Sequence, residues 1–124
     1  MNTKKILIVE DENPASFPLR DKLNHEGYVV LQAKNGEEGL VIALKEKPDL
    51  LLVDILMPKM DGIEMIKELR KDDWGKNAKI IILTNMTGLE HVQKAIESEV
   101  FEYLIKSDIT LEYLINKVKN FLNR

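Results

Sequence analysis

The chain of 124 residues contains no cysteine and no long apolar segment. The absence of cysteine excludes disulfides, thiol catalysis and thiolate metal sites. No apolar run approaches the roughly 20 residues that a membrane span needs. The run at residues 6–9 stops at Glu10 and Asp11, far too early for a secretion signal. The net charge of −3 includes no block of like charge, which argues against a nucleic-acid surface. We therefore expect a cytoplasmic protein that binds neither membranes nor nucleic acids directly.

Length and composition indicate a single globular domain. A hydrophobic fraction of 44% and a charged fraction of 31% are typical of soluble globular proteins. A chain of this length buries most of its apolar surface when it folds. The sequence shows no linker, low-complexity tract or repeat. We therefore predict that one domain occupies residues 1–124.

Five short apolar runs alternate with segments of helical periodicity. The runs are residues 6–9, 29–31, 50–53, 80–83 and 100–105. The first four are continuous, which is typical of strands buried on both faces of a parallel sheet. The segments between them repeat apolar side chains at helical spacing, as in Leu40, Ala43 and Leu44. The alternation predicts an α/β fold with right-handed crossovers.

Cap and turn signals support these boundaries, with one exception. Three pairs resemble capped helix starts: Asn35 and Glu38, Asp61 and Glu64, and Thr87 and Glu90. Gly27 follows the first predicted helix, where a left-handed residue commonly ends a helix. Pro18 is the exception, since a proline in the second turn of a helix costs about 3 kcal/mol. The helix either begins after Asn13, with Ser16 as its cap, or is kinked, and we predict the late start.

Polar side chains follow four of the predicted strands. Glu10 and Asp11 come after the first strand, Asp54 after the third, Thr84 ends the fourth, and Lys106 follows the fifth. Ligand sites of open α/β sheets gather beyond the carboxyl ends of the strands, so we expect these groups to meet. Taken singly, they could be a helix cap, loop acids, a strand threonine and an exposed lysine. Their joint placement at four strand ends favours a functional site.

This set of groups suits phosphoryl transfer to a carboxylate. Clustered carboxylates repel one another unless a cation lies among them. Oxygen ligands without histidine or cysteine favour Mg²⁺, which takes one or two carboxylates and keeps several waters. Lys106 and Thr84 could hold phosphoryl oxygens. Asp54 would be the nucleophile that forms an aspartyl phosphate.

The most specific motif is Asp54-Ile55-Leu56-Met57-Pro58-Lys59-Met60-Asp61-Gly62. Further markers at matching places are Glu10-Asp11, Asn35-Gly36, Pro48-Asp49, Thr84 and Lys106. With these markers the chain resembles the receiver domain of two-component response regulators over essentially its whole length. The resemblance implies a doubly wound, flavodoxin-like sheet of five parallel strands in the order 2-1-3-4-5, with five helices. It also implies phosphorylation by a histidine kinase or phosphotransfer protein, and a downstream protein target for the fourth helix, fifth strand and fifth helix.

The same resemblance implies a role for each site residue. Asp54 would be phosphorylated, and Asp11, Asp54 and the backbone carbonyl of Leu56 would bind Mg²⁺. Glu10 would act on the ion mainly through water, and Lys106 would pair with the phosphoryl group. Thr84 would move toward that group and vacate space that Tyr103 fills. These two residues would form a switch with two positions.

Two positions depart from the family pattern, and two others bear on the lifetime of the phosphoryl group. Asn85 replaces a small residue and could narrow access to the site, and Ser107 replaces a proline, so the Lys106–Ser107 peptide lacks that constraint. Leu56 and Met86 occupy the two positions that flank the phosphoryl group. Neither side chain can orient an attacking water. We therefore predict slow self-dephosphorylation. We also expect the domain to catalyse its own phosphoryl transfer but to have no independent enzyme activity.

Two other functions compete with this interpretation. A phosphatase of the haloacid-dehalogenase type would need a second aspartate at the place of Leu56. A pseudo-receiver would keep the fold as a binding module without being phosphorylated. The sequence leaves open a stand-alone regulator, a phosphorelay intermediate and an excised domain. We interpret His25 and His91 as surface residues and Trp74 as an anchor to the core.

Overall fold

The computed structural model describes residues 3–11, 13–85, 88–97, 99–100 and 102–123, and its centre is a five-stranded parallel sheet. The strands are β1 (Lys5–Val9), β2 (Val29–Ala33), β3 (Leu50–Val53), β4 (Ile80–Thr84) and β5 (Glu102–Ile105). Their order across the sheet is β2-β1-β3-β4-β5. The predicted doubly wound topology is confirmed, and the strand order reverses between β1 and β3.

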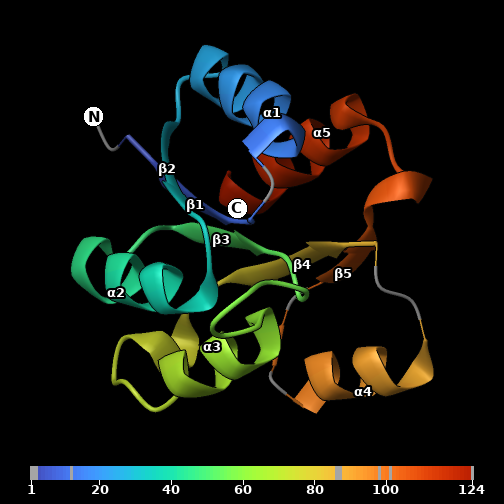
Figure 1. Cartoon of the computed structure of the whole chain (residues 1–124). Helices are drawn as coiled ribbons and strands as arrows, with labels where there is room; N and C mark the ends of the chain where they lie inside the picture. The colour runs from blue at the N-terminus through green and yellow to red at the C-terminus, as the bar shows by residue number, and fades with distance from the viewer. Residues whose placement is uncertain (1–2, 12, 86–87, 98, 101, 124) are drawn as a thin grey trace.

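Five helices cover the two faces of the sheet in the part of the chain that the structure describes (Figure 1). One face carries α1 (Asn13–His25) and α5 (Leu111–Leu122), and the other carries α2 (Gly36–Glu46), α3 (Gly62–Leu69) and α4 (Leu89–Glu97). Short 3₁₀ turns lie before β4, at η1 (Gly75–Asn77), and after β5, at η2 (Lys106–Asp108). None of the helices described here is long and apolar enough to cross a membrane.

The alternation of side chains along the strands divides the core into two clusters. In β1, Leu7 and Val9 pack with residues of α2 and α3, whereas Ile6 and Ile8 pack with residues of α1 and α5. Both faces of β1, β3 and β4 are therefore buried, which explains their continuous apolar sequences. The edge strand β5 is only partly buried, and it begins at Glu102, within the predicted run 100–105.

Two of the predicted helix caps are confirmed. Asn35 Oδ1 accepts the Glu38 N–H at 2.9 Å at the start of α2, and Asp61 Oδ1 accepts the Glu64 N–H at 2.8 Å at the start of α3. Thr87 lies outside the described residues. After α1, Gly27 has a φ of +99°, as expected for a residue that closes a helix in the left-handed region.

The predicted late start of α1 is wrong. The helix begins at Asn13, and Pro18 lies inside it. Leu19 and Leu23 of the same helix are buried in the cluster shared with α5. Burying a leucine side chain contributes about 1.5–3 kcal/mol, which offsets the cost of about 3 kcal/mol for the proline. Tertiary packing therefore overrides the local penalty.

The predictions for Trp74 and His25 are confirmed. Trp74 packs, partly buried, against the cluster that contains α2 and α3. His25 is exposed. The side chain of His91 lies outside the described part of the chain.

Candidate functional site

The carboxyl ends of β1 and β3 bring two acidic segments side by side. Val9 is the register partner of Val53, and the Asp54 N–H donates to the Val9 carbonyl at 2.9 Å. Glu10 and Asp11 therefore follow β1 directly beside Asp54. The site lies where the strand order reverses, which is the usual place for a ligand in an open α/β sheet.

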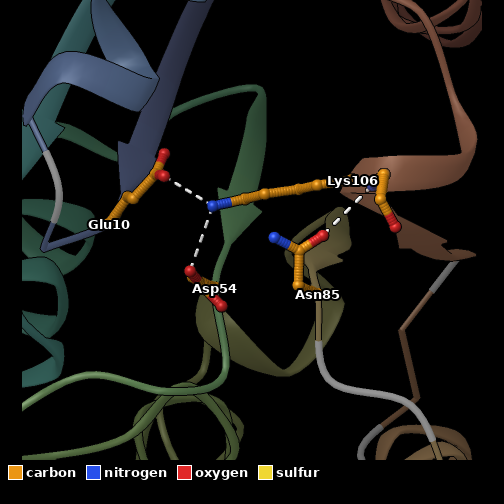
Figure 2. A network of polar contacts seen from close by, with 5 residues as sticks. Glu10, Asp54, Asn85 and Lys106 are labelled. Carbon is orange, nitrogen blue, oxygen red and sulfur yellow. Dashed lines mark hydrogen bonds and ion pairs between the residues drawn. The ribbon is translucent and has the colours of Figure 1, made fainter.

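Lys106 joins this edge from the end of β5. Its Nζ lies 2.5 Å from Glu10 Oε1 and 3.1 Å from Asp54 Oδ2 (Figure 2). Burial lowers the pKa of Lys106, but hydrogen bonds and charge from Glu10 and Asp54 outweigh burial and raise the pKa above its ordinary value. Lys106 therefore stays charged and offsets the repulsion between the two carboxylates.

Sequence reasoning missed the contact between Glu10 and Lys106. Glu10 is 6% exposed, and a buried carboxylate needs a charged or hydrogen-bonding partner. Its position directly after the continuous apolar run at residues 6–9 was a signal for burial. The sequence placed Glu10 and Lys106 at the same edge of the sheet, although they are 96 positions apart, but it did not indicate which acidic side chain would pair with the ammonium.

A pocket of about 580 Å³ opens at this edge of the sheet. Its lining residues are Asp11, Asp54, Leu56, Met57, Pro58, Thr84, Asn85 and Lys106. Asp11 is exposed and Thr84 is almost fully buried. The structure therefore brings together the predicted residues from the ends of four strands. No three His, Cys, Asp or Glu side chains form a ready metal cluster within the described ranges.

The loop between β3 and α3 packs tightly against Asp54. The Gly62 N–H donates to the Ile55 carbonyl at 2.9 Å. A Cβ atom on Gly62 would lie 2.1 Å from the Asp54 carbonyl oxygen, so only glycine fits at this position. The first turn of α3 therefore holds the backbone of Asp54 in place.

Thr84 and Tyr103 lie on the same face of the sheet. Ile82 pairs with Tyr103, and Thr84, two residues after Ile82, shares its face. Tyr103 packs, partly buried, against the cluster on that face. Burial and the negative charge of Asp54 raise the pKa of Tyr103. The phenol is thus near enough to the site to respond to the charge of Asp54.

The departures from the family pattern also have structural consequences. Asn85 Oδ1 accepts the Ser107 N–H at 3.1 Å, which joins the end of β4 to η2 (Figure 2). A proline at position 107 could not make this bond, and the Lys106–Ser107 peptide is trans. Leu56 is 67% exposed at the pocket. Met86 lies outside the described residues.

These groups can accept and hold a small anion. Asp54 offers a nucleophilic carboxylate, Lys106 an ammonium and Thr84 a hydroxyl, and Asp11 adds a second carboxylate suited to a cation. Fold and site together define a flavodoxin-like α/β domain with an acidic pocket at the point where the strand order reverses.

Comparison with known proteins identifies the family. The family model of the response regulator receiver domain matches residues 6–119. The chain belongs to this family, the receiver domains of two-component signal transduction. Its members interact with histidine kinases or phosphotransfer proteins and with downstream effectors.

Similar proteins include single receivers and longer regulators. The chain is 36% identical over 122 residues to sporulation initiation phosphotransferase F of Bacillus subtilis (strain 168). The matched region covers 98% of this chain and 96% of that protein. It is 48% identical over 68 residues to the alkaline phosphatase synthesis transcriptional regulatory protein PhoP of the same organism, covering 55% of this chain but 28% of that protein.

Solved structures share the fold. A CheY-like receiver domain protein from Methanospirillum hungatei JF-1 has a TM-score of 0.90 at 30% identity, with 98% of this chain and 95% of that chain covered. Chemotaxis protein CheY4 from Vibrio cholerae has a TM-score of 0.88 at 28% identity, with 97% and 99% covered.

Proposed function

We propose that residues 1–124 form a phospho-accepting receiver and that Asp54 is its phospho-acceptor. The donor would be the phosphohistidine of a histidine kinase or phosphotransfer protein. The observation that carries this proposal is the Asp54 carboxylate in the open pocket, 3.1 Å from the Lys106 ammonium. A buried carboxylate paired only for stability would not need a pocket of about 580 Å³ beside it.

The transfer step uses groups that line the pocket. A carboxylate oxygen of Asp54 forms a new P–O bond while the P–N bond to the donor imidazole breaks, and the imidazole then takes up a proton from solvent. Lys106 turns from the Asp54 carboxylate to a phosphoryl oxygen, and Thr84 donates its hydroxyl to another. Glu10 keeps the ammonium beside the acceptor through the 2.5 Å contact.

The donor set fits Mg²⁺. Asp11 and Asp54 line the same pocket as Leu56, whose backbone carbonyl would be a third oxygen ligand. Glu10 would act mainly through water. A site with two carboxylates and no complete protein cage suits an ion that keeps several of its waters. When bound, Mg²⁺ would offset the negative charge of the phosphoryl oxygens.

Phosphorylation would then change the surface of the domain. Thr84 moves toward the phosphoryl group, and Tyr103, on the same face of the sheet, occupies the space that it leaves. The change reaches α4, β5 and α5, where a downstream protein would bind. The relative of nearly equal length is named a phosphotransferase, which supports a role in passing phosphoryl groups between proteins.

The test is to incubate the purified chain with Mg²⁺ and acetyl phosphate and measure its intact mass. We expect one added phosphoryl group that requires Mg²⁺ and disappears in Asp54→Ala. The matched control is Asp73→Ala, since the Asp73 side chain is fully exposed. A chain that stays unmodified would be a pseudo-receiver, and continuous release of phosphate with many turnovers would indicate a phosphatase.

A further inference from the structure

Asn85 places a side-chain amide at the pocket, where the family pattern has a small residue. It directly follows Thr84, the last residue of β4, and lines the pocket together with Asp54 and Lys106. Nothing in the transfer step described above uses this amide. Because Asn85 is exposed and lines the pocket, its side chain can contact a ligand that enters.

The hydrogen bond to Ser107 determines which way the amide faces. A backbone N–H can only donate, so the atom of Asn85 that faces Ser107 must be its oxygen, at 3.1 Å. The amide nitrogen therefore points away from Ser107. Figure 2 shows it on the side of Asp54 and of the Lys106 ammonium. In the described part of the chain this nitrogen donates to no protein acceptor.

We propose that Asn85 is a phosphoryl-binding residue, whose amide donates a hydrogen bond to an oxygen of the group on Asp54, with the Ser107 N–H holding the amide in that orientation. This inference rests on the proposed function. Phosphoryl oxygens are acceptors that carry negative charge, and hydrogen bonds to charged groups are about twice as strong as neutral ones. A donor that is already oriented needs no rearrangement when the anion arrives.

A bulky residue at the mouth could instead only obstruct the pocket. The two interpretations predict opposite effects of Asn85→Ala. Loss of an obstruction would strengthen anion binding, whereas loss of a donor would weaken it. Asn85→Asp separates them further, because the carboxylate has nearly the same shape and still accepts from Ser107, but it offers negative charge in place of two N–H donors.

The experiment titrates beryllofluoride in the presence of Mg²⁺ and follows binding by ¹⁹F NMR. We expect Asn85→Ala to weaken binding about tenfold and Asn85→Asp to weaken it further, as for a lost hydrogen bond to a charged group. The side-chain NH₂ signals of Asn85 in the wild type should shift on binding. The matched control is Asn77→Ala, which changes an exposed asparagine at η1.

A double-mutant cycle tests the role of Ser107. Ser107→Pro removes the N–H that orients the amide, so it should weaken binding in the wild type more than in the Asn85→Ala background. Equal losses in both backgrounds would overturn the orienting role.

Two results separate the inference from the function on which it rests. If the wild type binds beryllofluoride and Asp54→Ala does not, the site is active. Unchanged or tighter binding by Asn85→Ala would then overturn the donor role alone. A wild type that shows no saturable binding would overturn both the proposed function and this inference.

Discussion

Close contacts of single residues control the position of Asp54. Position 62 requires a glycine, because the Asp54 carbonyl oxygen occupies the space that a Cβ atom would need. The carboxylate of Asp54 in turn lies against Lys106, and its charge reaches Tyr103. Substitutions of Gly62 or Asp54 should therefore change stability, anion binding or the pKa of Tyr103, whereas similar substitutions at exposed positions should not.

Gly62→Ala should both destabilise the fold and impair the site. The added methyl group must displace the Asp54 backbone or the start of α3, and overpacking of this kind costs about 1–3 kcal/mol. Urea unfolding would measure the loss, and beryllofluoride titration should show weaker binding. Glu64→Ala, on the exposed side of α3, is the control. Equal behaviour of the two variants would contradict the tight packing.

Tyr103 should report the charge of Asp54. Its pKa is raised by burial and by the Asp54 carboxylate, since both disfavour the phenolate. Asp54→Asn should therefore lower the pKa of Tyr103, although burial keeps it above the ordinary value of 10.0. NMR of the labelled ring during a pH titration measures the shift, and Asp73→Asn should leave it unchanged.

The raised pKa of Tyr103 also determines how its contribution to the stability of the fold changes with pH. The folded state holds the phenolic proton more tightly than the unfolded state does. The contribution of Tyr103 to stability is thus complete below pH 10.0 and is lost as the pH rises through the folded pKa.

Leu56 and Met86 should make the phosphorylated state long-lived. Neither side chain can orient a water for attack on the phosphoryl group, and positioned acid–base groups typically contribute about 10²–10⁴-fold to such steps. Leu56→Asn combined with Met86→Glu should shorten the lifetime of phospho-Asp54 at least about tenfold. Loss of the phosphoryl group is followed by intact mass, with Leu44→Asn on α2 as the control. A lifetime no shorter in the double variant would count against this idea.

At the scale of elements, Arg70 connects segments that lie far apart in the sequence. Its guanidinium follows α3 and donates to the carbonyls of Gly75 at 2.7 Å, Ala78 at 2.8 Å and Glu99 at 2.8 Å. These carbonyls belong to η1, to the residue after it, and to the loop between α4 and β5. The Arg70 side chain therefore stabilises the two segments that lead into β4 and β5.

Arg70→Met should reduce the free energy of unfolding by about 2–4 kcal/mol, because it leaves three carbonyls without a charged donor. The neighbouring substitution Lys71→Met removes only an exposed ion pair with Glu68 and should cost less than about 1 kcal/mol. Urea unfolding of both variants makes the comparison. Similar losses in the two would show that Arg70 is not a structural connection.

At the scale of the whole molecule, the carboxylates gathered at the site make the stability of the fold depend on bound cations. Folding brings Glu10, Asp11 and Asp54 to one edge of the sheet, and Lys106 neutralises only part of their charge. A cation that binds this edge in the folded state alone must stabilise the entire domain.

Mg²⁺ should therefore raise the free energy of unfolding by about 2.7 kcal/mol at a hundred times its dissociation constant. Thermal unfolding with MgCl₂, compared with NaCl at equal ionic strength, measures this effect. Asp11→Asn should remove most of it, whereas Asp108→Asn, an exposed change at η2, should not. A gain that persists in Asp11→Asn would argue against an ion at this site.

Sequence periodicity predicted the alternation of strands and helices, whereas the order of the strands followed from the resemblance to the receiver family. Continuous apolar runs at residues 50–53 and 80–83 are typical of strands that are buried on both faces of a parallel sheet. The caps at Asn35 and Asp61 are local interactions across three residues, so a short stretch of sequence contains them entirely. The gathering of strand-end residues follows from topology, because the carboxyl ends of parallel strands meet at one edge.

Tertiary structure alone decided three features. Helix α1 includes Pro18, and the burial of its Leu19 and Leu23 against α5 offsets the local penalty of the proline. The pairing of Glu10 with Lys106 and the bond from Ser107 to Asn85 join residues 96 and 22 positions apart. The sequence places these residues at one edge of the sheet, but which side chains pair there depends on side-chain packing, which local periodicity does not determine.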